Sequence, residues 1–214
     1  MTFAEQFGTL LPQVMSWERG WPYFLMALAF GYLCGSIPFG VLVARIFGLG
    51  NLREIGSGNI GATNVLRTGS KKAAAATLAL DMAKGWVPVA AMLWQWGDFA
   101  AQLAGIGAFL GHLFPVWLKF KGGKGVAAFL GVILGFSVYA GLLCCAAWLA
   151  TAVIFRISSL AALVMSLTAP VWLWFMGERG AIWAAIILIV MIWNKHDENI
   201  ARLRAGTEPK IGAK

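Results

Sequence analysis

Charged residues are scarce in this sequence of 214 residues, and their scarcity argues against an ordinary water-soluble domain. They make up 12% of the chain and hydrophobic residues 60%, whereas about a quarter and about a half are usual in soluble domains. Only nine acidic residues and two histidines are present. With a mean hydropathy of +0.76, the composition predicts an integral membrane protein of a single domain.

Cysteine and targeting signals are also sparse. The three cysteines, Cys34, Cys144 and Cys145, all lie in apolar runs, and an odd number there predicts no disulfide framework. Residues 1–22 lack the basic start, apolar middle and small-residue end of a cleavable signal. We expect 1–22 to form a polar or interfacial N-terminal lead-in.

The apolar runs predict seven transmembrane helices. The 30 uncharged residues at 126–155 are long for one helix and short for two full crossings. We interpret them as two short helices that turn at 135–137 or at Gly141. The predicted spans are 23–48, 73–96, 100–118, two within 126–155, 160–176 and 181–193.

The net charge of +8 is compatible with nucleic-acid binding, but the positions of the cations favour membrane topology as its cause. Seven spans place thirteen Lys and Arg residues on one side and only Arg19 and Arg179 on the other. Cytoplasmic loops are enriched in Lys and Arg. We therefore expect an all-α integral membrane protein with its N-terminus outside, a membrane domain at 23–194 and a cytoplasmic C-terminal segment at 195–214. A single crossing at 126–155 would abolish the charge bias.

A polar, glycine-rich stretch at 56–67 interrupts the apolar sequence. Its glycines allow positive φ and close approach to a ligand, and its neutral side chains and one guanidinium suit an anion. A solvated linker is the alternative. The candidate binding residues are Gly56, Ser57, Gly58, Asn59, Gly61, Thr63, Asn64 and Arg67.

A second basic, glycine-rich loop lies at 119–125. Lys124 follows Gly122 and Gly123, whose amides would present an anion nest. The spacing is not that of a P-loop, because no Ser or Thr follows the lysine. The alternative is an ordinary basic loop that fixes topology.

Two more segments on the same side carry polar residues. Ser158 and Ser159 begin a predicted helix, where they would cap the helix or bind an anion at its N-terminus. His196 and Asn199 are three residues apart and share a helix face, so they would act as base, phosphate partner or donor. The alternative for them is a solvated juxtamembrane helix.

Three ionisable residues fall within or at the end of predicted spans. Charges at membrane depth are costly, and we expect Asp81 and Lys84 to neutralise one another at i and i+3. His112 ends the third span directly before the second basic loop. We expect it to brace that loop by a hydrogen bond rather than to touch a substrate.

In their order along the chain, these motifs resemble the bacterial acyl-phosphate:glycerol-3-phosphate acyltransferase family over about 32–208. The motifs are GSIPFG at 35–40, GSGNIGATNVLR at 56–67, DMAKG at 81–85, GHLFP at 111–115, FKGGKGVA at 120–127 and HDENIARL at 196–203. The chain departs from the family pattern in its long lead-in and at Ala128, where a hydroxyl residue is common.

The resemblance implies a bacterial inner-membrane enzyme whose active site faces the cytoplasm. Such an enzyme transfers a fatty acyl group from acyl phosphate to the sn-1 hydroxyl of glycerol 3-phosphate. The products are lysophosphatidic acid and phosphate, in the first step of phospholipid synthesis. The resemblance implies no cofactor and no metal. The implied partners are membrane lipid and, transiently, the soluble enzyme that supplies the acyl phosphate.

The resemblance also implies residue roles. Ser57, Arg67, Lys124, His196 and Asn199 match the positions that hold glycerol 3-phosphate and the reacting groups. Thr63, the nearby glycines and Ser159 match the positions around the acyl phosphate.

The chemistry of the donor leads to an expectation of its own. An acyl phosphate carries a good leaving group, so the attacking hydroxyl needs positioning more than a strong base. Neither histidine is followed by the His-x4-Asp spacing of soluble-facing acyltransferases. We expect no dedicated His–Asp base, and the donor's phosphate would accept the proton.

A transporter of a phosphorylated small molecule is the rival interpretation, since it would also need anion-binding loops. Transporters usually place their site near the midplane between detectable repeats. Here the polar clusters lie on one face and no repeat is evident. The enzyme is therefore the favoured interpretation.

Overall fold

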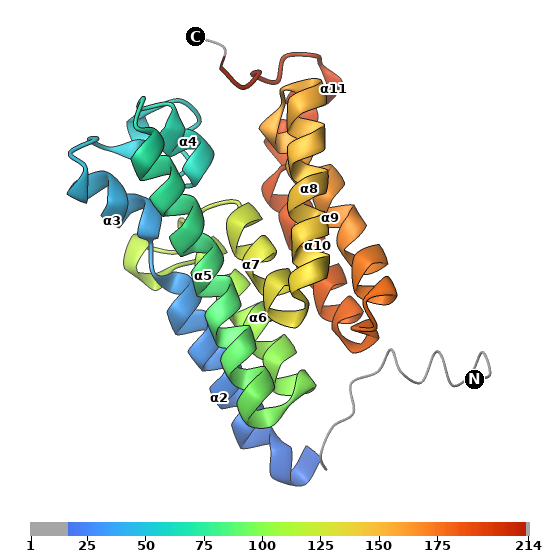
Figure 1. Cartoon of the computed structure of the whole chain (residues 1–214). Coiled ribbons are helices and arrows are strands. Elements are labelled where there is room, and N and C mark those ends of the chain that lie inside the picture. The colour runs from blue at the N-terminus through green and yellow to red at the C-terminus, as the bar shows by residue number, and fades with distance from the viewer. Residues whose placement is uncertain (1–16, 213–214) are drawn as a thin grey trace.

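The computed structural model describes residues 17–212, and all regular structure within them is helical. Seven apolar helices form a bundle, and three short helices lie at the end where the C-terminus emerges (Figure 1). The bundle helices are α2 (Trp17–Ser36), α5 (Lys71–Trp96), α6 (Asp98–Leu113), α7 (Val126–Phe136), α8 (Val138–Phe155), α9 (Ser158–Phe175) and α10 (Ile182–Lys195). The short helices are α3 (Phe39–Ile46), α4 (Ala62–Leu66) and α11 (Asp197–Arg204), and 3-10 turns occur at Leu52–Glu54, Val116–Leu118 and Arg179–Ala181.

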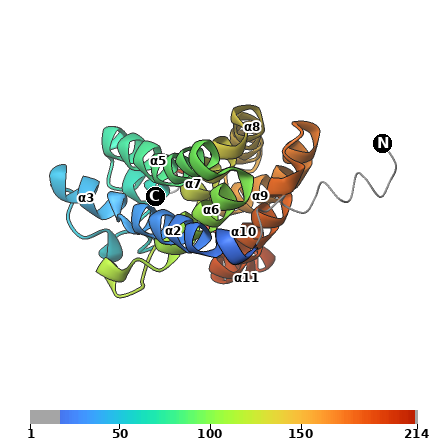
Figure 2. The same ribbon diagram turned by 90° about the horizontal axis from the view of Figure 1, so that it is seen from below.

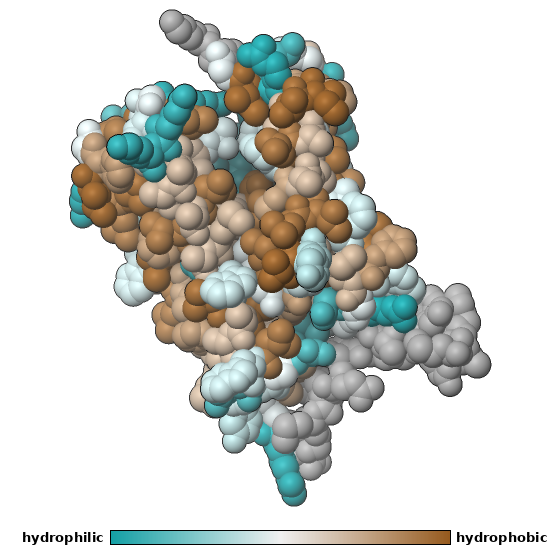
Figure 3. All heavy atoms as spheres, viewed as in Figure 1, coloured by the Kyte–Doolittle hydropathy of each residue, from teal (hydrophilic) through white to brown (hydrophobic). Residues whose placement is uncertain are grey.

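Five stretches of the described chain are long and apolar enough to cross a membrane. They are Arg19–Ile46, Lys71–Trp96, Asp98–Leu118, Val138–Phe155 and Ser158–Phe175. Helices α7 and α10 are apolar but shorter, with 11 and 14 residues. Apolar side chains cover most of the middle of the molecular face in Figure 3, and hydrophilic residues gather towards its ends. The all-helical fold with several apolar spans therefore agrees with the predicted integral membrane protein.

The first predicted span differs from the observed helices at both ends. Helix α2 begins at Trp17 in the described part of the chain, so residues 17–22 are helical. Residues 1–16 of the predicted lead-in lie outside the described residues. The helix ends at Ser36, and α3 starts only after Pro38. Proline lacks an N–H and disfavours helical geometry at the residue before it, so 23–48 is two helices instead of one.

Proline also shortens the third predicted span, whereas the break within 126–155 is confirmed. Helix α6 ends at Leu113, since Phe114 precedes Pro115. Helices α7 and α8 meet at Ser137, whose Oγ accepts a hydrogen bond of 3.3 Å from the Ala140 amide and so caps α8. The uncharged run therefore consists of two helices, as predicted, but only α7, with 11 residues, is short, since α8 has 18.

Small residues bring α2 and α6 into close contact. A Cβ on Gly31 would lie 2.0 Å from the Ala104 carbonyl oxygen, and one on Gly35 would lie 1.9 Å from that of Ala108. Gly31 and Gly35 are four residues apart on α2, and Ala104 and Ala108 are four residues apart on α6. This spacing is the small-xxx-small pattern of membrane helix interfaces. Seen along the bundle, α6 occupies the middle (Figure 2), where it packs against α2, α5, α7 and α10.

The buried charges of α5 are paired as the sequence predicted. Lys84 Nζ lies 2.7 Å from Asp81 Oδ1, and both side chains are buried. The same ammonium donates a hydrogen bond of 2.8 Å to the Ile37 carbonyl. This contact fixes α5 against the break between α2 and α3, and α3 then leads into the loop before α4.

Candidate active site

The predicted site residues from three distant segments meet at the end of the bundle that carries α4 and α11. The Lys124 ammonium, just before α7, donates to Asn199 Oδ1 on α11. Asn199 Nδ2 in turn donates to Glu208 Oε1 over 2.6 Å. Ser159 Oγ, in the first turn of α9, donates to the same oxygen over 2.7 Å. Lys124 therefore contacts Asn199 directly, and Glu208 links Asn199 to Ser159. Glu208 was not among the predicted site residues.

Glu208 is the acceptor on which these donors converge. Arg202 Nε lies 2.7 Å from its second oxygen, and the Glu208 side chain is only 7% exposed. Burial by itself would raise the pKa of Glu208, but hydrogen bonds from Ser159, Asn199 and Arg202 outweigh it, and the pKa falls below its usual value. The carboxylate therefore stays ionised and holds the C-terminal segment over the first turn of α9.

The first glycine loop (residues 49–61) is folded around Asn64 of α4. Asn64 Oδ1 accepts from the Ser57 amide over 3.1 Å and from Ser57 Oγ over 3.4 Å. Its Nδ2 donates to the Leu52 carbonyl over 3.0 Å. Asn64 is buried, and Asn59 likewise accepts locally, from the Ile60 amide. The side-chain contacts of both asparagines shape this loop.

Arg67 lies across the backbone of the first glycine loop. A Cβ on Gly56 would lie 2.6 Å from Arg67 Cδ and 2.9 Å from one guanidinium nitrogen, and Gly56 has φ of +51°. Both the space and the backbone angle therefore require glycine. Within residues 17–212 no hydrogen bond or ion pair of the Arg67 guanidinium is found, and the side chain is exposed.

Thr63 connects α4 to α9. Its Oγ1 lies 3.3 Å from Ser158 Oγ, at the start of the helix that also carries Ser159. Gly61 is the N-cap residue of α4. The N-termini of α4, α7 and α9 are thus linked through Thr63, Lys124 and Ser159. Helix N-termini expose unpaired amides and favour anions.

The second glycine loop (residues 119–125) corrects one expectation. The Gly122 amide donates to the Leu113 carbonyl and the Gly123 amide to the His112 carbonyl, each over 3.1 Å. These two amides do not form the predicted anion nest, because they hold the loop against the end of α6. The unpaired amides at this point belong to the first turn of α7, which follows Gly125.

His112 braces the second glycine loop, as predicted, but through two contacts. Its carbonyl accepts from Gly123, and a Cβ on Gly123 would lie 2.4 Å from His112 Nε2. The imidazole therefore lies directly beneath this glycine. Its Nδ1 lies 3.9 Å from Asp81 Oδ1, too far for a hydrogen bond.

His196 is buried where α10 ends, with 3% of its surface exposed. Its Nδ1 lies 2.8 Å from the Ile192 carbonyl, and because a carbonyl only accepts, this nitrogen carries the proton. Burial, and secondarily the charge of Lys124, lower the pKa of His196, against the opposing effect of the Ile192 hydrogen bond. The ring is therefore neutral near pH 7, which leaves Nε2 as an acceptor.

Lys124 is half-buried, with one cation and three carboxylates near it. Burial, followed by the charge of Arg202, lowers the pKa of Lys124, while Glu198, Glu208 and Asp197 act in the opposite direction. A desolvated cation whose pKa is lowered in this way gains from an incoming anion. The ammonium is well placed to bind a phosphate.

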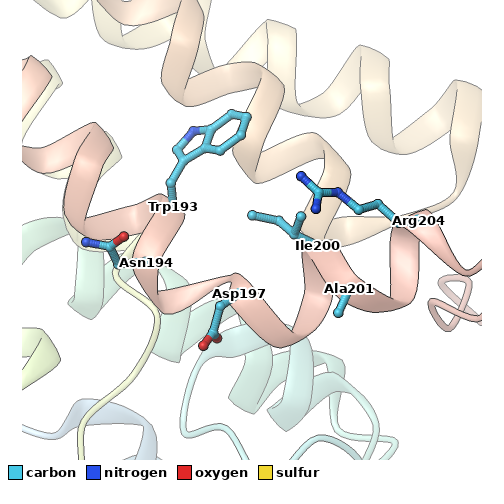
Figure 4. Close-up of a pocket in the computed structure, with 6 residues that line it drawn as sticks. All are labelled: Trp193, Asn194, Asp197, Ile200, Ala201 and Arg204. Carbon is cyan, nitrogen blue, oxygen red and sulfur yellow. The ribbon is translucent and has the colours of Figure 1, made fainter.

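A surface hollow of about 570 Å³ lies on the opposite face of α10 and α11. It is lined by Trp193, Asn194, Asp197, Ile200, Ala201 and Arg204. In Figure 4, Trp193 and Arg204 stand well apart on one side of the helical turn, and Asp197 points away from them. None of the predicted site residues lines this hollow, so the polar cluster around Glu208 is the better candidate site.

The sequence did not indicate Glu208, Arg53 or Arg202 as residues of the site. A signal for Glu208 existed, since it is the one acidic residue after Glu198 in a strongly basic C-terminal segment. In the sequence, Arg53 is one of the thirteen Lys and Arg residues predicted on one side of the membrane. Its guanidinium donates to the backbone carbonyls of Gly58 and Lys121. A sequence gives no sign of which carbonyls a side chain will reach.

The chain is similar to proteins of one family along most of its length. The family profile for glycerol-3-phosphate acyltransferase matches residues 25–206. Glycerol-3-phosphate acyltransferases of Ruegeria sp. and Dinoroseobacter shibae are 60% and 59% identical to it. These matches cover 92% and 89% of this chain and 98% and 93% of the relatives.

Solved structures agree with the sequence comparison. The crystal structure of PlsY, an integral membrane glycerol 3-phosphate acyltransferase, in its glycerol 3-phosphate form has a TM-score of 0.83 and 37% identity. That alignment covers 88% of this chain and 96% of PlsY. The lysophosphatidic acid form has a TM-score of 0.81 and 35% identity, with coverage of 88% and 95%. The chain therefore belongs to the glycerol-3-phosphate acyltransferase family.

Proposed function

We propose that this acyltransferase uses an acyl phosphate as its donor and glycerol 3-phosphate as its acceptor. Membership of the family makes the chain an enzyme that acylates the sn-1 hydroxyl of glycerol 3-phosphate to lysophosphatidic acid. That reaction is the first step of phospholipid synthesis. The observation that carries the proposal is the meeting of Lys124, Asn199 and Ser159 at the N-termini of α7 and α9. Helix N-termini favour anions, so these two ends suit the two phosphate groups of the proposed reaction.

The acceptor's phosphate is assigned to Ser57, Arg67 and Lys124. Arg67 is exposed against Gly56, the residue before Ser57, and a guanidinium binds phosphate through two parallel hydrogen bonds. Lys124 gains from a nearby anion because it is half-buried next to Arg202. We assign Asn199 and the neutral Nε2 of His196 to the reacting hydroxyl, which both can orient by hydrogen bonding.

The donor's phosphate is assigned to the first turns of α4 and α9. Thr63 and Ser159 supply hydroxyl groups there, the glycines of the first loop allow close approach, and unpaired helix amides favour the anion. The hydroxyl oxygen of the acceptor attacks the acyl carbon. The bond from that carbon to the phosphate oxygen then breaks, and the departing phosphate takes the hydroxyl proton. Positioning is the main contribution of the protein.

The membrane orientation is part of the same proposal. The seven bundle helices would each cross the bacterial inner membrane, with the N-terminus outside and the active site facing the cytoplasm. The loops at the site end carry most of the Lys and Arg residues of the chain, in keeping with the positive-inside rule. The acyl phosphate would come from a soluble enzyme by transient contact at this face, and the acyl chain would lie among membrane lipids.

Purified protein in detergent tests the donor assignment. We expect it to form lysophosphatidic acid from palmitoyl phosphate and glycerol 3-phosphate, and to form little with palmitoyl-CoA at the same concentration. Mass spectrometry of the lipid product measures both reactions. Equal turnover with the two donors would contradict the acyl-phosphate assignment and leave the acceptor assignment intact.

A further inference from the structure

We infer that Arg53 is a positioning residue that sets the spacing between the two glycine loops, and this inference rests on the proposed function. One guanidinium nitrogen of Arg53 donates to the Gly58 carbonyl over 3.1 Å. The other terminal nitrogen donates to the Lys121 carbonyl. Gly58 directly follows Ser57, and Lys121 lies three residues before Lys124. One side chain thus binds both loops that the proposal assigns to the acceptor's phosphate.

The backbone of Arg53 is fixed by the same network that shapes the first glycine loop. Its amide donates to Asn51 Oδ1 over 3.1 Å, which caps the 3-10 turn Leu52–Glu54. Leu52 is buried, and its carbonyl accepts from Asn64. Since Asn64 also binds Ser57, Arg53 and Ser57 belong to one rigid unit. The guanidinium extends from that unit to the second loop.

Within residues 17–212, no other side-chain hydrogen bond joins residues 49–61 to residues 119–125. A planar guanidinium holds two acceptors at a fixed separation, which a flexible ammonium does not. The distance between Ser57 and Lys124 therefore depends on Arg53. Loss of its contacts would leave both residues present but misplaced for a single phosphate group.

The contacts of Arg53 and Arg67 indicate different roles. Two donors of Arg53 are engaged by backbone carbonyls, whereas no hydrogen bond of the Arg67 guanidinium is found within the described residues. Arg67 can therefore bind phosphate, while Arg53 holds the loops. Arg53 acts on the acceptor through the position of Lys124 and does not need to touch it.

The test compares wild type with Arg53→Met, Arg53→Gln and Arg53→Lys. Arg45→Met is the matched control, because Arg45 is an exposed arginine of α3. Steady-state kinetics with palmitoyl phosphate give KM for each substrate. Calorimetric titration with glycerol 3-phosphate alone gives binding without turnover, and thermal unfolding in detergent monitors the fold.

We expect Arg53→Met to weaken glycerol 3-phosphate binding and raise its KM roughly tenfold, the effect of losing hydrogen bonds from a charged donor. The KM for palmitoyl phosphate and the unfolding temperature should change little. Arg53→Gln, which keeps a neutral donor, should lie between Arg53→Met and wild type. Arg45→Met should behave as wild type.

Three results would overturn the inference. One is wild-type binding by Arg53→Met. Another is an equal loss for both substrates together with a lower unfolding temperature, which would mean a general structural role. The third is full recovery in Arg53→Lys with none in Arg53→Gln, which would mean that the positive charge contacts phosphate directly. An inactive wild-type protein would instead count against the proposed function, so the two failures are distinguishable.

Discussion

At the scale of single residues, Glu208 connects the most parts of the site, because it accepts from Ser159, Asn199 and Arg202. We expect Glu208→Gln to lower kcat/KM at least about tenfold. An ionised acceptor strengthens each hydrogen bond by roughly 1 kcal/mol or more, and 1.4 kcal/mol corresponds to tenfold. Glu198→Gln is the control, since Glu198 is 78% exposed and 3.9 Å from Arg202. Equal activity of the two variants would show that the contacts of Glu208 are dispensable.

His196 gives the site a predictable dependence on pH. Burial lowers the pKa of His196, so the unfolded chain binds a proton first as the pH falls below about 6.5. Proton uptake by the unfolded state lowers folding stability. We expect the unfolding temperature to drop between pH 7 and 5, and to drop less in His196→Gln.

The comparison with His196→Gln isolates this residue, because His112 is present in both proteins. Identical pH profiles would show that His196 does not contribute. Above about pH 7 both states carry a neutral imidazole, so no change is expected there from this residue.

At the scale of elements, the position of the site depends on how closely helices pack. The Gly35 Cα lies so near α6 that a Cβ would be 1.9 Å from the Ala108 carbonyl oxygen. Gly35→Val should therefore force α2 and α6 apart and destabilise the protein by at least ~2 kcal/mol, since overpacking displaces backbone. Thermal unfolding in detergent measures this.

The control for Gly35 is Leu33→Val on the same helix, where 56% of the leucine is exposed. It should leave stability nearly unchanged. If both variants unfold at the same temperature, close packing of α2 on α6 does not stabilise the bundle.

At the scale of the whole molecule, the break between α7 and α8 determines topology. With two crossings at 126–155, the second glycine loop and the C-terminal segment share one side of the membrane. In a variant with its three cysteines replaced by alanine, we expect Lys121→Cys and Gly206→Cys to react with an impermeant thiol reagent only from the cytoplasm. Gly177→Cys should react only from outside. Labelling of Lys121→Cys and Gly206→Cys from opposite sides would exclude seven crossings.

Much of the fold could be predicted because membrane helices follow local rules. Long apolar runs identify the helices, and the loss of helical geometry near Pro38 and Pro115 could have been anticipated from proline chemistry. The two-helix interpretation of 126–155 was correct, because 30 residues are long for a single helix across a membrane. The exact ends of helices were less predictable, since residues 17–22, which include Glu18 and Arg19, are also helical.

The candidate site was predictable in its residue types but not in its contacts. Glycines, an arginine and a lysine in loops on one side pointed to an anion site from composition alone. Asn64 turned out to shape its own loop, and the amides of Gly122 and Gly123 were already engaged. Hydrogen-bond partners far apart in sequence decide such roles, and no local pattern encodes them.

The sequence by itself therefore determined the membrane class, the order of the helices and the family, because hydropathy, charge bias and motifs are written along the chain. Only the tertiary structure decided which polar groups meet. It brought Glu208 within hydrogen-bond distance of Asn199 and Ser159 and placed Arg53 between two glycine loops. These contacts arise from the packing of helices around α6, which sets distances between segments that the sequence leaves unspecified.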